Sequence, residues 1–214
     1  MQSFYCAWTI SAILLLALAA MAGRVSRAKS LVGILIDDRG RYSLNRLQLV
    51  MWTILILSAF LGIASMSAGF NLPQIPANYL PLLGISAGTA VLAGAVKDSK
   101  NVSGAVVQSK GAFAVDPATK ARVSVQSLAA GAASEAISPH FAQVFLEEEG
   151  QAADLVVSVT KFQNFIFTVA LGIWFVAATI RLKDPGFPAL PDNVLWLLGI
   201  SHATYVGGKV PTKA

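Results

Sequence analysis

The chain has 214 residues, of which 55% are hydrophobic and only 13% are charged. An average soluble domain has about 25% charged residues, so a soluble protein of this size would lack the charge to cover its surface. Residues 1–23, 47–96 and 162–180 contain no Asp, Glu, Lys or Arg. Such stretches suit a bilayer, because a transmembrane helix needs about 20 apolar residues. The composition excludes a soluble enzyme and predicts an integral membrane protein.

The first predicted span covers about residues 7–23. Its N-terminal flank has no Lys or Arg, whereas Arg24, Arg27 and Lys29 follow it, which favours an uncleaved anchor over a signal peptide. The single cysteine, Cys6, allows no intramolecular disulfide.

Four more spans are predicted beyond this anchor. Pro73 and Pro76 divide the long uncharged block into spans at 47–68 and 79–97, because a proline inside a helix costs about 3 kcal/mol. The last two spans are predicted at 162–181 and 194–208, and the final one is short enough to be re-entrant instead.

The basic residues indicate the orientation of the chain. With the N-terminus outside, the cytoplasmic segments 24–46, 97–161 and 209–214 contain 14 of the 16 Lys and Arg residues. This is the positive-inside pattern, and it places the C-terminus in the cytoplasm. The net charge of +5 is then a signal of topology, and we expect no nucleic-acid partner.

The sequence matches itself when it is shifted by 115 residues. The segment 82–86 (LLGIS) falls on 197–201, and Gln48 falls on Gln163. Of the 56 aligned positions from 43 to 98, 15 are identical, including two prolines and an asparagine in the turn. We therefore expect two parallel-repeat hairpins.

The predicted fold is an all-α integral membrane helical bundle with five spans. Its predicted parts are an anchor span with a basic segment (1–46), the first hairpin (47–97), a small cytoplasmic insert (98–157) and the second hairpin (158–214). In each hairpin a serine (Ser43 or Ser158) and an asparagine (Asn78 or Asn193) are expected to cap the two helices, and Arg46 or Lys161 to hold the cytoplasmic end. Small residues spaced along the returning helices predict close helix packing: Gly84, Gly88, Gly199, Ala203 and Gly207.

For the insert, the sequence predicts only local secondary structure. Residues 105–125 suggest a β-hairpin around Asp116-Pro117, and 127–137 suggest a helix. Ser138-Pro139 is predicted to begin another helix that ends near Glu149. A catalytic domain is not expected here.

A few polar residues in the predicted spans are candidates for function. His202 is a weak candidate for a cofactor ligand or proton relay, and we favour a neutral imidazole bonded to a Ser or Thr of a neighbouring helix. Gln48 and Gln163 are expected to form hydrogen bonds between helices in equivalent environments, or else to line a polar entrance. The predicted polar intramembrane set is Gln48, Gln163, Ser86, Ser201, Thr204 and His202.

Two acidic clusters are weak candidates for a divalent cation site, although such clusters usually face water. They are Asp37 and Asp38, and Glu147, Glu148 and Glu149. The sequence contains no phosphate-binding loop, HExxH motif or Ser-His-Asp pattern. We expect no enzymatic activity, no cofactor and no resident metal.

The motifs S-x-x-[RK]-[LF]-Q, P-x-x-P-x-N and LLGIS-x-x-T-x-V occur in both 43–98 and 158–213. This combination resembles small bacterial inner-membrane proteins of uncharacterised function. The resemblance implies a bacterial inner membrane and assigns no catalytic residue.

Two functional hypotheses follow from the sequence. The first is a structural or assembly subunit that packs through its glycine-lined helices against copies of itself or other membrane subunits. The alternative is an oligomeric channel or pore-forming effector lined by Gln48, Gln163, Ser86, Ser201 and Thr204.

Overall fold

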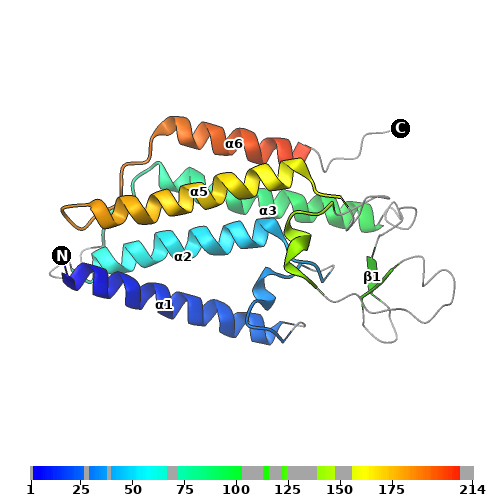
Figure 1. Cartoon of the computed structure of the whole chain (residues 1–214), viewed down its shortest axis with the longest axis horizontal. Coiled ribbons are helices and arrows are strands. Elements are labelled where there is room, and N and C mark those ends of the chain that lie inside the picture. Colours follow the sequence, from blue (N-terminus) through cyan, green and yellow to red (C-terminus); the bar gives the residue numbers. More distant parts are fainter. Residues whose placement is uncertain are drawn as a thin grey trace.

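The computed structural model describes residues 2–26, 29–37, 40–66, 72–102, 113–115, 122–124, 139–147 and 156–207. Five long helices lie side by side along the long axis of this part of the chain (Figure 1). They are α1 (Gln2–Val25), α2 (Leu44–Ala64), α3 (Tyr79–Val102), α5 (Val159–Arg181) and α6 (Asp192–Gly207). Each of the five segments predicted as a span therefore contains a long helix over its described residues, although α2 ends at Ala64, before the predicted end of its span.

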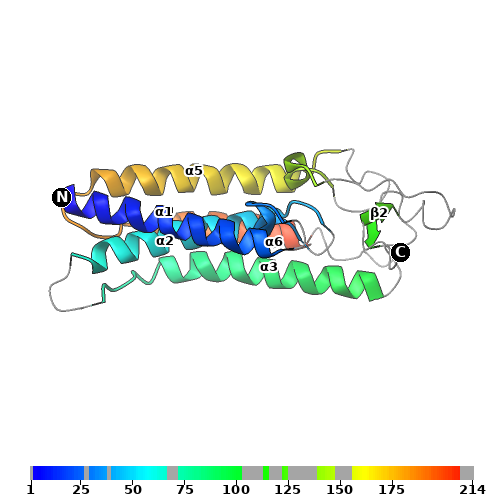
Figure 2. The same ribbon diagram turned by 90° about the horizontal axis from the view of Figure 1, so that it is seen from below.

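The helices form a four-membered ring with one helix attached outside. In the ring α2 packs against α3 and α5, and α6 also packs against α3 and α5, while α1 packs against α2. The second view shows α3 and α5 on opposite sides of α2 (Figure 2). Trp8 of α1 donates a hydrogen bond from Nε1 to Ser58 Oγ of α2 at 3.0 Å, so a polar contact adds to this packing.

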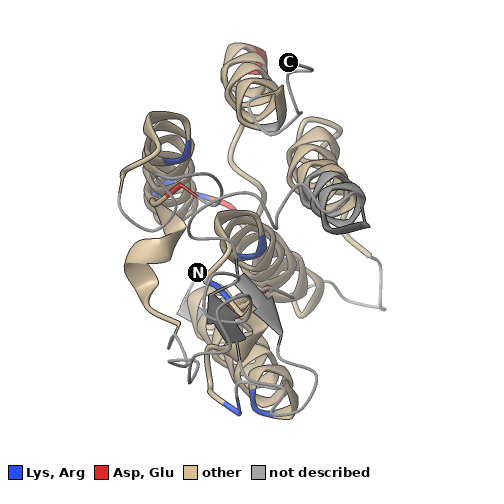
Figure 3. Cartoon of the chain, turned by 90° about the vertical axis from the view of Figure 1, so that its right-hand side faces the viewer, with Lys and Arg blue, Asp and Glu red and all other residues tan. Residues whose placement is uncertain are grey.

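The chain reverses direction from each long helix to the next. The start of α1 and the ends of α2 and α5 lie at one end of the bundle, and the ends of α1, α3 and α6 lie at the other (Figure 1). Seen along the helices, most of the bundle is uncharged (Figure 3). This arrangement is compatible with the predicted topology.

Among the described residues, three helical segments are long and apolar enough to cross a membrane: Ser3–Val25, Leu44–Ala64 and Val159–Arg181. With 16 residues, α6 is shorter than the roughly 20 residues that a full span needs. Large apolar side chains point outward, for example Ile13 and Ile173, each 66% exposed. An apolar exterior on helices of this length indicates a membrane protein.

The centre of the bundle combines aromatic and aliphatic side chains from four helices. Tyr79 of α3 packs edge-on against Phe175 of α5, with ring centroids 5.8 Å apart. Its hydroxyl donates to the Pro188 carbonyl at 2.6 Å, so this buried phenol is satisfied. Trp52, Leu82 and Leu198 complete this centre.

The insert differs in part from the prediction. Strands β1 (Phe113–Val115) and β2 (Arg122–Ser124) pair antiparallel with Phe113 opposite Ser124, as predicted around Asp116-Pro117. This hairpin is an exception to the all-α prediction. The helix predicted from Ser138-Pro139 to Glu149 is wrong over the described residues, which form only the 3₁₀ turn η2 (Phe141–Val144) and then a β-bridge between Leu146 and Val157. The helix predicted at 127–137 lies outside the described residues.

The predicted helix caps are correct in position for three of the four residues, because Asn78, like the two serines, directly precedes its helix, α3. Ser43 and Ser158 directly precede α2 and α5, but neither side chain makes a capping hydrogen bond. Asn193 lies inside α6, which begins at Asp192. Asn78 instead connects the two turns, because its Nδ2 donates to the Leu190 carbonyl at 3.0 Å and to Asp192 Oδ1 at 2.9 Å.

Candidate functional site: polar contacts between the helices

A buried polar cluster joins α2 to α5 and consists of Gln48, Asn164 and Thr168. Gln48 Nε2 donates to Thr168 Oγ1 at 2.6 Å and to Asn164 Oδ1 at 3.1 Å. Thr168 Oγ1 in turn donates to the Asn164 carbonyl at 2.8 Å, so its single proton is used and it accepts the bond from Gln48. All three side chains are at least 98% buried. The cluster therefore fixes how α2 lies against α5.

This cluster is one donor and one acceptor short of complete hydrogen bonding. Gln48 Oε1 and Asn164 Nδ2 are buried without a partner among the described residues. Turning both side-chain amides by 180°, so that oxygen and nitrogen change places, would keep the Gln48–Asn164 bond. It would again leave one donor and one acceptor unpaired. Because unpaired buried groups are costly, the net stabilisation is smaller than the number of bonds suggests.

Gln163, the repeat counterpart of Gln48, does not join this cluster. Gln48 is 1% exposed, whereas Gln163 lies on the exposed face of α5. The prediction that the two amides occupy equivalent environments is wrong. The adjacent residue, Asn164, is buried in its place. The buried positions of α5 are therefore shifted by one residue from those that the repeat predicts.

His202 lies buried between α6 and α3. Its Nδ1 is 2.8 Å from Thr89 Oγ1, so the predicted contact with a threonine of a neighbouring helix is present. Thr89 Oγ1 also donates to the Ile85 carbonyl at 2.7 Å. Since its one proton is used there, His202 Nδ1 donates to Thr89, and the hydrogen bonds assign the imidazole to the Nδ1–H tautomer. Nε2 then remains an acceptor without a partner among the described residues.

The residues predicted to line a pore do not share one surface. Gln48, Ser86 and Ser201 are buried between helices of the chain. Gln163 and Thr204 are exposed, and Thr204 Oγ1 donates to the carbonyl of Ile200 in its own helix. A lining made of all five would need both buried and outward-facing positions, so this arrangement disfavours the pore hypothesis.

The predicted small-residue positions leave space instead of contacting helices of the same chain. A Cβ built at Gly84, Gly88 or Gly207 meets nothing within 4 Å, and one at Gly199 meets only Ile85 Cδ1 at 3.8 Å. Ala203 is exposed. These positions are therefore open to a partner outside the chain, and their predicted role in packing against copies of the chain or other subunits stays a prediction.

The close helix contact within the chain occurs at a glycine that the spacing motif did not reveal. A Cβ at Gly62 of α2 would lie 3.1 Å from both Cα and Cβ of Trp8 in α1. The glycine thus lets α1 approach the backbone of α2. Gly62 has no glycine four residues away in α2, so only the packing identifies it.

The loop before α2 and the loop before α5 are hydrogen-bonded to each other at the end of the bundle where these helices begin. Arg41 donates from its guanidinium to the Glu147 carbonyl at 3.0 Å, and Lys161 Nζ donates to the Leu146 carbonyl at 2.7 Å. Both cationic side chains are at least 97% buried. Lys161 thus holds the start of α5, as the sequence predicts, through a backbone carbonyl, whereas Arg41 was not among the predicted residues.

The acidic residues near these loops form no candidate metal centre in the described part of the chain. Asp37 Oδ1 accepts a hydrogen bond from the Arg41 backbone N–H at 2.9 Å and so closes its own loop. No group of three His, Cys, Asp or Glu side chains suited to a metal occurs among the described residues. Asp38, Glu148 and Glu149 lie outside the residues that the structure describes.

Comparison of the chain with protein-family models, curated proteins and solved structures gives no significant match. The resemblance based on the hairpin motifs therefore stays a prediction.

Proposed function

We propose that the chain is a non-enzymatic, five-span protein of a bacterial inner membrane that serves as a structural or assembly subunit. The observation that carries the proposal is the open glycine face of α3, formed by Leu80, Gly84, Gly88 and Val91. Three helices apolar enough to cross a membrane support the setting. The buried polar groups Gln48, Thr89 and His202 bond across helix interfaces, which supports a packing role.

The glycine face is shaped to receive another helix. Its four residues are spaced by four, four and three positions, so they lie on one side of α3. Leu80 and Val91 are 57% and 71% exposed, and a Cβ at either glycine would meet nothing within 4 Å. Small residues let helix backbones approach closely in a bilayer. We infer that α3 of a second copy, or a helix of another subunit, packs here.

The proposal includes an internal duplication, which the backbone supports. Before the first hairpin, Ser43 N–H donates to the Leu35 carbonyl, and before the second, Ser158 N–H donates to the Phe145 carbonyl. In the turns, Tyr79 N–H donates to the Pro76 carbonyl and Val194 N–H donates to the Pro191 carbonyl. These paired contacts accompany the 15 sequence identities.

The test is the native mass of the full chain in mild detergent. Gly84→Leu combined with Gly88→Leu fills the glycine face, and we expect the mass to fall to that of the monomer. Ala17→Leu, which adds one similar side chain to the exposed side of α1, is the control and should keep the native mass. A wild-type protein that is already monomeric, or a double variant that keeps the oligomeric mass, would contradict the proposal.

A further inference from the structure

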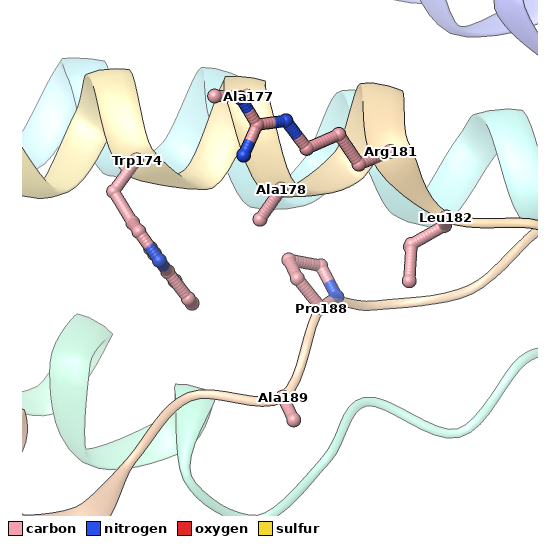
Figure 4. Close-up of a pocket in the computed structure, with 7 residues that line it drawn as sticks. All are labelled: Trp174, Ala177, Ala178, Arg181, Leu182, Pro188 and Ala189. Carbon is pink, nitrogen blue, oxygen red and sulfur yellow. The ribbon is translucent and has the colours of Figure 1, made fainter.

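A pocket lies beside the end of α5. Its walls include Trp174, Ala177, Ala178 and Arg181 of α5, and Pro188 and Ala189 of the following turn (Figure 4). Its volume is about 350 Å³, near the lower limit of the roughly 300–1,000 Å³ of small-molecule sites. The space suits one acyl segment with a small head group.

The pocket extends from the end of an apolar helix into its body. Arg181 is the last residue of α5, and Trp174 lies seven residues earlier. At 1.5 Å per residue this separation is about 10 Å along the helix axis. If α5 crosses a bilayer, Arg181 lies at the polar interface, while Ala177, Ala178 and Trp174 lie at the depth of the acyl chains.

Arg181 provides an uncompensated positive charge at this pocket. Its guanidinium has no ion-pair or hydrogen-bond partner among the residues that the structure describes. In Figure 4 its side chain extends back along α5 toward the Trp174 side of the pocket. Asp192, an acidic residue in the same turn region, already accepts a hydrogen bond from Asn78.

We propose that this pocket binds an anionic phospholipid. The phosphate contacts the Arg181 guanidinium, whose planar donors match phosphate oxygens, and an acyl chain lies over Ala177 and Ala178 against Trp174. Ala177 and Ala178 are small, so they leave space in the pocket that larger side chains would fill. The inference depends on α5 lying in a bilayer and not on the glycine face of α3.

The test reports on Trp174 in the full-length protein, reconstituted into vesicles. Phospholipids with brominated acyl chains quench nearby tryptophan, and the difference between the wild type and Trp174→Phe isolates the emission of this residue. The probes are brominated phosphatidylglycerol and brominated phosphatidylcholine, each at the same mole fraction in phosphatidylcholine vesicles. We expect stronger quenching by the anionic lipid.

Arg181→Gln should reduce the apparent preference for the anionic lipid about fivefold, the change that corresponds to about 1 kcal/mol for one basic residue at a membrane surface. Lys183→Gln, an exposed cation two residues further along, is the matched control and should keep the preference. Ala178→Leu should remove it by filling the pocket.

Three outcomes would overturn the proposal. The first is equal quenching by the two lipids in the wild type. The second is an equal loss of preference in Arg181→Gln and Lys183→Gln, which would indicate a diffuse surface charge. The third is loss of the preference when inorganic phosphate is added at constant ionic strength, which would indicate a site for the free anion.

Discussion

The contact between Gln48 and Thr168 leads to a prediction about stability in the membrane. Replacing Gln48 with Leu places an apolar side chain of similar size between α2 and α5 and removes the donor of three hydrogen bonds. They reach Thr168 Oγ1 at 2.6 Å, Asn164 Oδ1 at 3.1 Å and the Asn164 carbonyl at 3.4 Å. Asn164 Oδ1 then loses its partner, whereas Thr168 keeps its bond to the Asn164 carbonyl. We expect Gln48→Leu to destabilise the folded protein.

The expected magnitude follows from hydrogen bonds measured between membrane helices. These contribute about 0.6 kcal/mol on average and reach about 1.7 kcal/mol, so the two shorter bonds of Gln48 together correspond to about 1 kcal/mol. Loss of the unpaired Gln48 Oε1 offsets part of the cost. A double-mutant cycle with Thr168→Val isolates the strongest contact, and we expect a coupling free energy of about 0.6–1.7 kcal/mol.

The assay is reversible unfolding of the full chain in bicelles, with Gln163→Leu as the matched control. Gln163 lies on the exposed face of α5, so its replacement should change the free energy of unfolding by less than about 0.5 kcal/mol. Equal losses for the two glutamine variants, or a coupling below about 0.3 kcal/mol, would refute the reasoning that α2 and α5 are joined at Gln48.

Three further predictions concern packing, the loop junction and topology. Gly62→Leu should cost about 1–3 kcal/mol through overpacking, because its Cβ would lie 3.1 Å from Trp8; a loss as small as that of Ala17→Leu in the same unfolding assay would contradict this. Lys161→Met removes the bond to the Leu146 carbonyl and should cost about 1.5–3 kcal/mol, seen as faster amide exchange at the start of α5; unchanged exchange would contradict it. Cys6, which is exposed, should react with an impermeant maleimide from outside intact cells, and reaction only after the cells are opened would contradict the predicted orientation.

The sequence predicts the helices well because the signals are local. The uncharged stretches and the two prolines place all five helices, and α2 begins directly after the predicted Ser43. The bond between His202 and a threonine was also predictable, because a buried imidazole needs a polar partner and Thr89 is within 2.8 Å. The sequence did not predict which side of each helix packs against its neighbours. Gly62 and Arg41 contact residues 54 and 106 positions away, and no local pattern encodes such pairs.

The two hairpins show why repeat alignment alone cannot identify buried residues. In α2 the buried positions include Gln48, Trp52 and Ile56, and in α5 they include Asn164, Thr168 and Gly172. Each member of the second set lies 116 residues after its counterpart, one more than the repeat of 115. One residue turns a helix face by about 100°, enough to move Gln163 out of the interface.

The returning helices show the same displacement. In α3 the buried positions include Leu82, Ser86 and Thr89, and the buried residues 116 positions later in α6 are Leu198, His202 and Tyr205. The same one-residue offset in both helices means that the two hairpins bury different faces of the aligned sequence, although the backbone contacts in the turns keep the spacing of 115. Among the described residues α1 packs mainly against α2, so the two hairpins have different neighbours. His202, for example, is aligned with Ala87 but is buried at the position that corresponds to Ser86 in the packing. Residues that are equivalent in the sequence alignment are therefore not equivalent in packing.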